Sequence, residues 1–109
     1  MFVHVTYFQV STGQIGRLRD RVSAGYLASV RKQSGFVRGY FLEKVDDPET
    51  AQLIMVWQNQ ASLEAFRSSE LMEAINKMLY ANLPGLRMQS ESYVARLRPE
   101  EHEVARASV

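Results

Sequence analysis

The pattern of hydrophobic and polar positions divides most of the chain into six regular segments. Apolar residues at helical spacing predict helices over 14–33 and from about residue 60 to residue 83, with Ser68-Ser69 breaking and recapping the second helix. Runs rich in β-branched and aromatic residues predict strands over 2–10, 36–45, 51–57 and 86–97. The order β-α-β-β-α-β is that of a ferredoxin-like α+β fold. Right-handed crossovers then place the first and third strands in the middle of an antiparallel sheet.

Short polar motifs mark the expected ends of these segments. Ser11 and Gln14 have the spacing of a capping box at the start of the first helix. Asn59 is a favourable N-cap for the second helix. Ser34-Gly35 predicts the end of the first helix, because glycine accepts the left-handed conformation at a C-terminus. Residues 46–50, DDPET, predict a hairpin loop.

Both faces of the predicted sheet are apolar. In the third strand, Leu53, Met55 and Trp57 share one face, and Ile54 and Val56 share the other. Similar groupings are expected in the first strand, Phe2 and Phe8 opposite Val3, Val5 and Tyr7, and in the second, Phe36, Tyr40 and Leu42 opposite Val37 and Phe41. Two helices cover only one face, and each large apolar side chain left in water forgoes roughly 1.5–3 kcal/mol. We therefore predict a homodimer that packs sheet against sheet.

Composition limits the classes of function. A chain of 109 residues is one domain, expected over 1–97 and followed by a charged tail over 98–109. The net charge of +1 is spread along the chain, so nucleic acid is not expected as a partner. Without cysteine there is no disulfide, thiolate metal site or cysteine nucleophile. No targeting segment and no apolar run of about 18 residues is present, which predicts a cytoplasmic protein with no membrane partner.

One titratable side chain stands out within the predicted domain. His4 is the only residue there whose unperturbed pKa lies near neutrality, and it is the candidate base. By strand alternation, His4 shares with Thr6 the face that turns toward the helices and Trp57. Met55, Phe66 and Met72 are candidate apolar walls of a substrate pocket. A structural histidine and a tryptophan that only fills the core are the alternative interpretations. A metal site is not expected.

Two stretches of the chain point to a family. SGFVRGY (34–40) and MVWQNQASLEAFRSSELMEAINK (55–77) resemble the antibiotic biosynthesis monooxygenases, which are dimeric α+β-barrel proteins. The resemblance covers roughly residues 2–97. It implies a pocket between sheet and helices. It also implies one of several activities, among them cofactor-free oxygenation of anthrones and quinols, and haem degradation.

Of the family's site residues, only the tryptophan is matched in this sequence. In the haem-degrading branch, the resemblance implies an asparagine on the first strand, the tryptophan of the third strand, and a histidine on the second helix that ligates iron. These positions are Thr6, Trp57 and Asn76 here. An amide does not replace imidazole as an axial ligand to haem iron, so haem degradation becomes a weak alternative.

The cofactor-free branch needs only a dry pocket, a base and hydrogen-bond donors. We therefore expect a cofactor-independent monooxygenase that acts on a small aromatic molecule of the quinol or anthrone type. Trp57, Asn76, His4 and Thr6 are its candidate catalytic residues. A non-catalytic dimer that binds an apolar ligand or regulates a partner is the alternative from another class.

Overall fold

The structure is a computed structural model that describes residues 1–96. The charged tail expected over 98–109 lies outside the described residues. An antiparallel sheet has the strand order β2-β3-β1-β4, as predicted, with the first and third strands in its middle. The strands are β1 (Phe2–Gln9), β2 (Phe36–Glu43), β3 (Thr50–Trp57) and β4 (Arg87–Val94).

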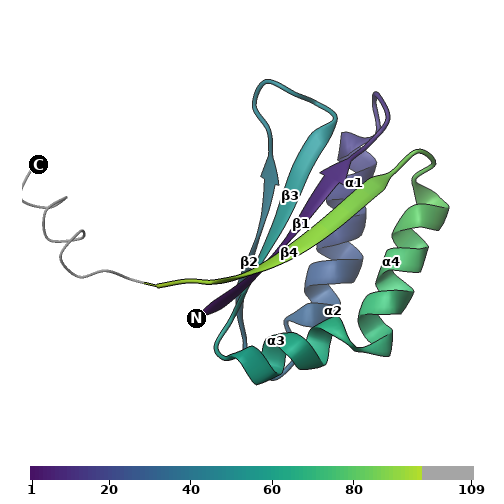
Figure 1. The fold of residues 1–109 in the computed structure, drawn as a ribbon. Helices are drawn as coiled ribbons and strands as arrows, with labels where there is room; N and C mark the ends of the chain where they lie inside the picture. Colours follow the sequence, from purple (N-terminus) through teal and green to yellow (C-terminus); the bar gives the residue numbers. More distant parts are fainter. Residues whose placement is uncertain (97–109) are drawn as a thin grey trace, which may run out of the picture.

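All helices of the described part lie against one face of this sheet (Figure 1). They are α1 (Ile15–Arg21), the π-helical segment η1 (Val22–Leu27), α2 (Ala28–Val30), α3 (Gln60–Arg67) and α4 (Glu70–Asn82). The arrangement confirms the α+β ferredoxin-like fold. No helix within residues 1–96 combines the length and apolar character that crossing a membrane requires.

The first helix differs from the single regular helix predicted over 14–33. Its fully buried side chains are Leu18, Val22, Tyr26 and Val30, each four residues from the next. In a regular α-helix that spacing drifts steadily around the axis, because a turn contains only 3.6 residues. The wider turns of η1 compensate for the drift and keep all four side chains on the sheet-facing side.

The helix caps predicted from the sequence are present at the starts of α3 and α4. The Asn59 side chain accepts from the Ser62 amide at 2.9 Å, and the Ser69 side chain accepts from the Met72 amide at 3.2 Å. The capping box predicted at the first helix is wrong. Gln14 is the N-cap and makes no side-chain cap bond, whereas the Ser11 hydroxyl donates to the Pro84 carbonyl at 3.3 Å.

A register shift in β2 overturns one predicted face. The pairing with β3 is irregular between Phe36 and Arg38, so the strand changes its alternation at Val37. Phe36 therefore packs edge-on against Trp57 on the helix side, with ring centroids 5.5 Å apart, instead of sharing a face with Tyr40. The sequence does not signal this bulge.

The two faces of the sheet differ in how they are covered. Helix-side residues of the central strands form the core, including Phe8, Leu53 and Trp57. The opposite face has no covering element among the described residues (Figure 1). Its apolar side chains, assigned by strand register, are Val3, Val5, Tyr7, Tyr40, Leu42, Ile54, Val56 and Tyr93. We call this set the open sheet face.

Gly13 and Gly35 together test how closely α3 packs against the start of β2. Gly13 and Gly35 both have φ of +82°, but a Cβ on Gly13 meets nothing, whereas one on Gly35 would lie 2.5 Å from Ser62 Cβ. Gly13→Ala should cost about 1–2 kcal/mol, the usual penalty of this backbone conformation. Gly35→Ala should cost clearly more, because α3 must also shift. Urea unfolding of both variants measures the difference, and equal costs would contradict the close approach.

Candidate functional site

His4, Thr6 and Trp57 lie together in the interior beneath the helices, on the face that strand alternation predicted. His4 and Thr6 are each 2% exposed, and Trp57 is fully buried. His4 pairs across the sheet with Met55, and its neighbour Phe2 pairs with Trp57. The tryptophan and the histidine are therefore diagonal neighbours on adjacent strands.

Phe66 is the centre of an aromatic cluster in this interior. Its ring stacks on Trp57 with centroids 5.2 Å apart and meets the His4 ring edge-on at 6.4 Å. The Tyr26 ring lies 6.3 Å from it, tilted. Such pairs each add about 0.5–1.5 kcal/mol beyond the area they bury. Phe66, a candidate pocket wall, thus fills the space between sheet and helices, with Met55 fully buried nearby.

Two nitrogen atoms in this cluster have no hydrogen-bond partner. They are Nε2 of His4 and Nε1 of Trp57, both buried. A buried polar group left unpaired costs about 1–3 kcal/mol, and most such groups in proteins are paired. Two of them on neighbouring strands are the pattern expected where a ligand supplies the missing partner.

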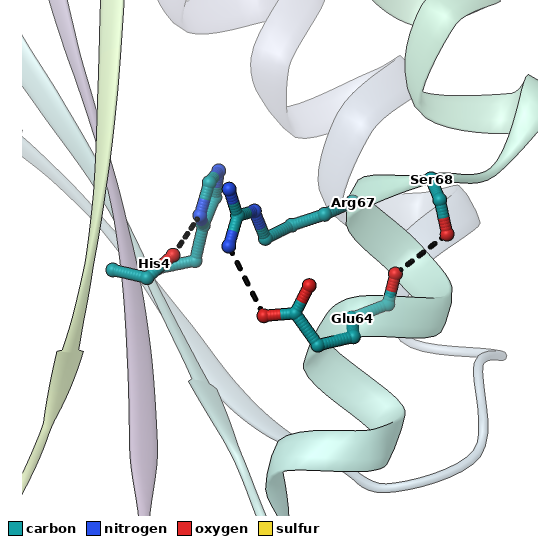
Figure 2. Close-up of polar contacts among 5 residues, drawn as sticks. His4, Glu64, Arg67 and Ser68 are labelled. Atoms are coloured by element: carbon teal, nitrogen blue, oxygen red, sulfur yellow. Dashed lines mark hydrogen bonds and ion pairs between the residues drawn. The ribbon is translucent and has the colours of Figure 1, made fainter.

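The surroundings of His4 keep its imidazole neutral. Burial, and then the positive charge of Arg67, lower its pKa to about 4, against a smaller opposing effect of Glu64. Nδ1 lies 3.1 Å from the Ser92 hydroxyl (Figure 2). When Nδ1 donates its proton to Ser92, Nε2 presents a free lone pair toward the interior.

A second group of polar side chains lies farther along the interior. The Tyr26 hydroxyl donates to Asn76 Oδ1 at 3.5 Å, a long bond, and also interacts with Thr6. Thr6 Oγ1 lies 3.2 Å from the Ser90 hydroxyl. Burial raises the pKa of Tyr26 to about 12, although the bond to Thr6 opposes the rise. Tyr26 therefore stays protonated and remains a hydrogen-bond donor.

Arg67 lines two hollows at the protein surface. A hollow of about 220 Å³ lies between α3 and the ends of β1 and β4, and its lining residues are Phe2, Gln60, Leu63, Glu64, Arg67, Ser92, Tyr93 and Val94. The second, about 410 Å³, lies at the α3–α4 junction, and its lining includes Met72 and Asn76. Trp57, Thr6 and Met55 line neither hollow. The structure thus splits the predicted site into a packed interior and two surface openings.

Several residues of this region are not recognisable as site residues from the sequence. Ser90 and Ser92 alternate on β4, but their contact with Thr6 and His4 depends on a strand register that the sequence leaves open. Tyr26 lies inside the helix predicted over 14–33, and nothing in the helical pattern marks its hydroxyl as part of a polar group. Arg67 and Glu64 gave no signal at all, because charged residues on an exposed helix are common.

The residues present do not fit a haem. The position to which the family resemblance assigns the axial imidazole is Asn76, whose amide oxygen accepts from Tyr26. Within residues 1–96 the single histidine, His4, is buried and bonded to Ser92. The same residues contain no group of three or more side chains arranged to bind a metal ion.

The fold and the buried polar interior define a ferredoxin-like α+β protein with a candidate site between sheet and helices. The sequence profile of the antibiotic biosynthesis monooxygenase family matches residues 1–78, and the chain belongs to that family. A search among curated proteins gives no match.

Solved structures give the same fold. A mutant of SnoaB, a cofactor-independent oxygenase from Streptomyces nogalater, has a TM-score of 0.76 and 20% identity, covering 90% of this chain and 95% of that chain. A Nitrosomonas europaea protein described under the same family name has a TM-score of 0.72 and 14% identity, covering 89% of this chain and all of its own. At these identities the likeness establishes the fold.

The buried imidazole predicts a specific pH dependence of stability. Burial and the Arg67 charge lower the pKa of His4 from 6.5, its ordinary value, to about 4 in the folded protein, so the unfolded chain binds more protons between these limits. The free energy of unfolding should therefore fall as pH drops from about 6.5 toward 4, by on the order of 2–3 kcal/mol from this residue.

Urea unfolding of wild type and His4→Gln at pH 7.5 and 4.5 isolates this effect from the carboxylates, which titrate in both. The wild type should lose more stability than the variant over this interval. Equal losses would show that His4 is not held in its neutral form.

Proposed function

We propose that this protein is a cofactor-independent monooxygenase that oxidises a small aromatic molecule of the quinol or anthrone type. The observation that supports it most is the pair of unpartnered buried nitrogens on His4 and Trp57, set among aromatic rings. Membership of the monooxygenase family and the shared fold with SnoaB agree with this proposal. The functional domain would be residues 1–97.

The reaction requires no group beyond substrate and dioxygen. Loss of a proton gives an electron-rich anion, which transfers an electron to dioxygen. The two radicals then join to form a carbon–oxygen bond. Breaking the oxygen–oxygen bond leaves a carbonyl on the substrate, and the second oxygen atom departs as water with two hydrogens of the substrate: the proton lost in the first step and one from the oxygenated carbon. The protein's task is to position the anion and exclude bulk water.

In this proposal the four candidate catalytic residues divide the work. Neutral His4 accepts the proton at Nε2, while Ser92 orients the ring through Nδ1. The Trp57 indole N–H donates to the developing oxyanion. Asn76 accepts from Tyr26 through its amide oxygen and supplies its NH2 group as a further donor, while Thr6 positions the Tyr26 hydroxyl.

Met55, Phe66 and Met72 would form the apolar walls of this pocket. Phe66 stacks directly on Trp57, so a substrate ring would have to displace it from that position. Displacement is reasonable for a residue in the last turn of a short helix, since α3 has eight residues and ends beside the Ser68-Ser69 break.

The closely packed interior also supports a second candidate function. Trp57 is fully buried against Phe66, as it would be if its only role were to fill the core. In that case the protein would be a non-catalytic dimer that binds an apolar ligand or regulates a partner. A structure with an ordered ligand, together with no turnover, would favour this alternative.

Turnover tests the proposal directly. Oxygen uptake should be detected with members of a panel of anthrones and hydroxynaphthalenes, and Trp57→Phe should lower kcat by about a hundredfold through loss of one oxyanion donor. Tyr80→Phe, half-exposed on α4 and absent from the lining of both hollows, is the matched control and should leave the rate unchanged. An inactive panel, or equal rates in both variants, would contradict the proposed chemistry.

We also propose that the open sheet face pairs with the same face of a second copy. Tyr40, Leu42 and Tyr93 are 45–47% exposed on this face, so each would regain roughly half of the 1.5–3 kcal/mol that burial from full exposure gives. Tyr40 on this face and Tyr80 on α4 are 47% and 49% exposed, which makes them a matched pair. Tyr40→Glu should shift the protein to a monomer, whereas Tyr80→Glu should not.

Size-exclusion chromatography with light scattering at micromolar concentration measures both variants and the wild type. A monomeric wild type would overturn the proposal, as would a Tyr40→Glu variant that still dimerises.

A further inference from the structure

Arg67 occupies an unusual position for an exposed arginine. It is the last residue of α3, and its side chain points toward the strand that contains His4 (Figure 2). Its charge acts on His4, as the lowered pKa of that residue records. Arg67 also lines both surface hollows. One cation thus lies between bulk solvent and the buried polar site.

Most hydrogen-bonding capacity of this guanidinium is unused. Its one ion-pair partner among the described residues is Glu64, with Arg67 NH1 donating to Oε1 at 3.1 Å. Both side chains are about half exposed, and an exposed pair of this spacing contributes little to stability. A guanidinium has five N–H donors in a fixed planar arrangement that suits carboxylates and other oxyanions. An incoming anion can therefore accept hydrogen bonds from the free N–H groups of Arg67 and has only the weak Glu64 pair to displace.

The smaller hollow fits the aromatic part of such an anion. Its wall combines the apolar Phe2, Leu63 and Val94 with the Ser92 hydroxyl that bonds to His4. At about 220 Å³ it is smaller than pockets for drug-sized ligands, which span ≈ 300–1,000 Å³. It suits one or two fused rings, or one edge of a larger ring system.

We propose that Arg67 determines specificity by binding an anionic oxygen of the substrate, so that the protein selects acidic aromatic molecules over neutral ones of the same shape. The substrate class is then an aromatic compound with a carboxylate, or with a phenol or enol ionised near neutral pH. One edge of the ring system lies in the hollow beside Ser92, and the oxyanion meets the Arg67 guanidinium that lines the same hollow. This inference rests on the proposed function for its biological meaning. Its physical claim concerns binding alone.

Binding of an inert probe tests the claim without turnover. 1-Naphthoate is the anionic probe, and 1-naphthamide is its neutral counterpart of nearly equal shape. Trp57 is the only tryptophan of the chain, and its ring contacts Phe66, the residue before Arg67. Its fluorescence therefore reports binding close to the hollow. At pH 7.5 the wild type should bind naphthoate about tenfold or more tighter than naphthamide, as expected for hydrogen bonds to a charged group.

Three variants separate Arg67 from general electrostatics. Arg67→Gln should abolish the preference for the anion. Lys77→Gln removes another exposed cation, paired with Glu73 on α4, and should leave the preference intact. Glu64→Gln should strengthen naphthoate binding severalfold, because it removes both the competing partner and a repelling charge. A merely structural ion pair would give the opposite result for Glu64→Gln, since the helix would lose support.

The outcomes separate this inference from the proposed oxygenase activity. An anion preference that depends on Arg67 supports the inference even when no oxygen is consumed. Equal affinity for both probes in the wild type would overturn it, and so would a preference that survives in Arg67→Gln. The absence of any fluorescence response to either probe would overturn it as well.

Discussion

A strand turns successive side chains to opposite faces, and in this protein that alternation determines where chemistry is possible. Even-numbered residues of β1 lie under the helices, and odd-numbered ones lie on the open sheet face. The helix-covered face of a central strand is the driest part of a small α+β domain. His4 and Thr6 interrupt an otherwise apolar row at that place. A shift of one residue in register would move both to the open face and leave the interior without a titratable group.

The second determinant is how α3 is fastened over this row. Asn59 caps its start, and Ser69 caps the start of α4 two residues after α3 ends, so side-chain hydrogen bonds fix where both helices begin. The last turn of α3 places Phe66 on Trp57 and directs the Arg67 side chain toward the strand of His4. One short helix thus supplies both the aromatic packing and the positive charge of the site. Neutral imidazole, unpaired indole N–H and free guanidinium donors are consequences of the same placement.

The domain is incomplete in two respects that belong together. The open sheet face exposes apolar side chains, and the interior contains buried nitrogens without partners. Both features cost free energy in the isolated chain. A protein surface that covered the open sheet face would remove the first cost, and a small molecule that bonded to the buried nitrogens would remove the second. We propose a second copy for the former and the aromatic substrate for the latter. Family membership makes an oxygenase the consistent interpretation of both, because exclusion of water from an electron-rich anion is what such a reaction needs.

Local pattern by itself determined the element order, the strand order, the caps of α3 and α4, and the common face of His4, Thr6 and Trp57. These follow from periodicity, capping chemistry and the handedness of crossovers, all of which act over short stretches of chain. The bulge at Val37, the π-helical segment around Tyr26 and the bond between His4 and Ser92 required the tertiary structure. Register and helical twist are decided by packing between segments distant in sequence. The position of Arg67 shows this most clearly, because nothing in a helical pattern reveals that one exposed cation reaches a buried imidazole on a strand formed by the other end of the domain.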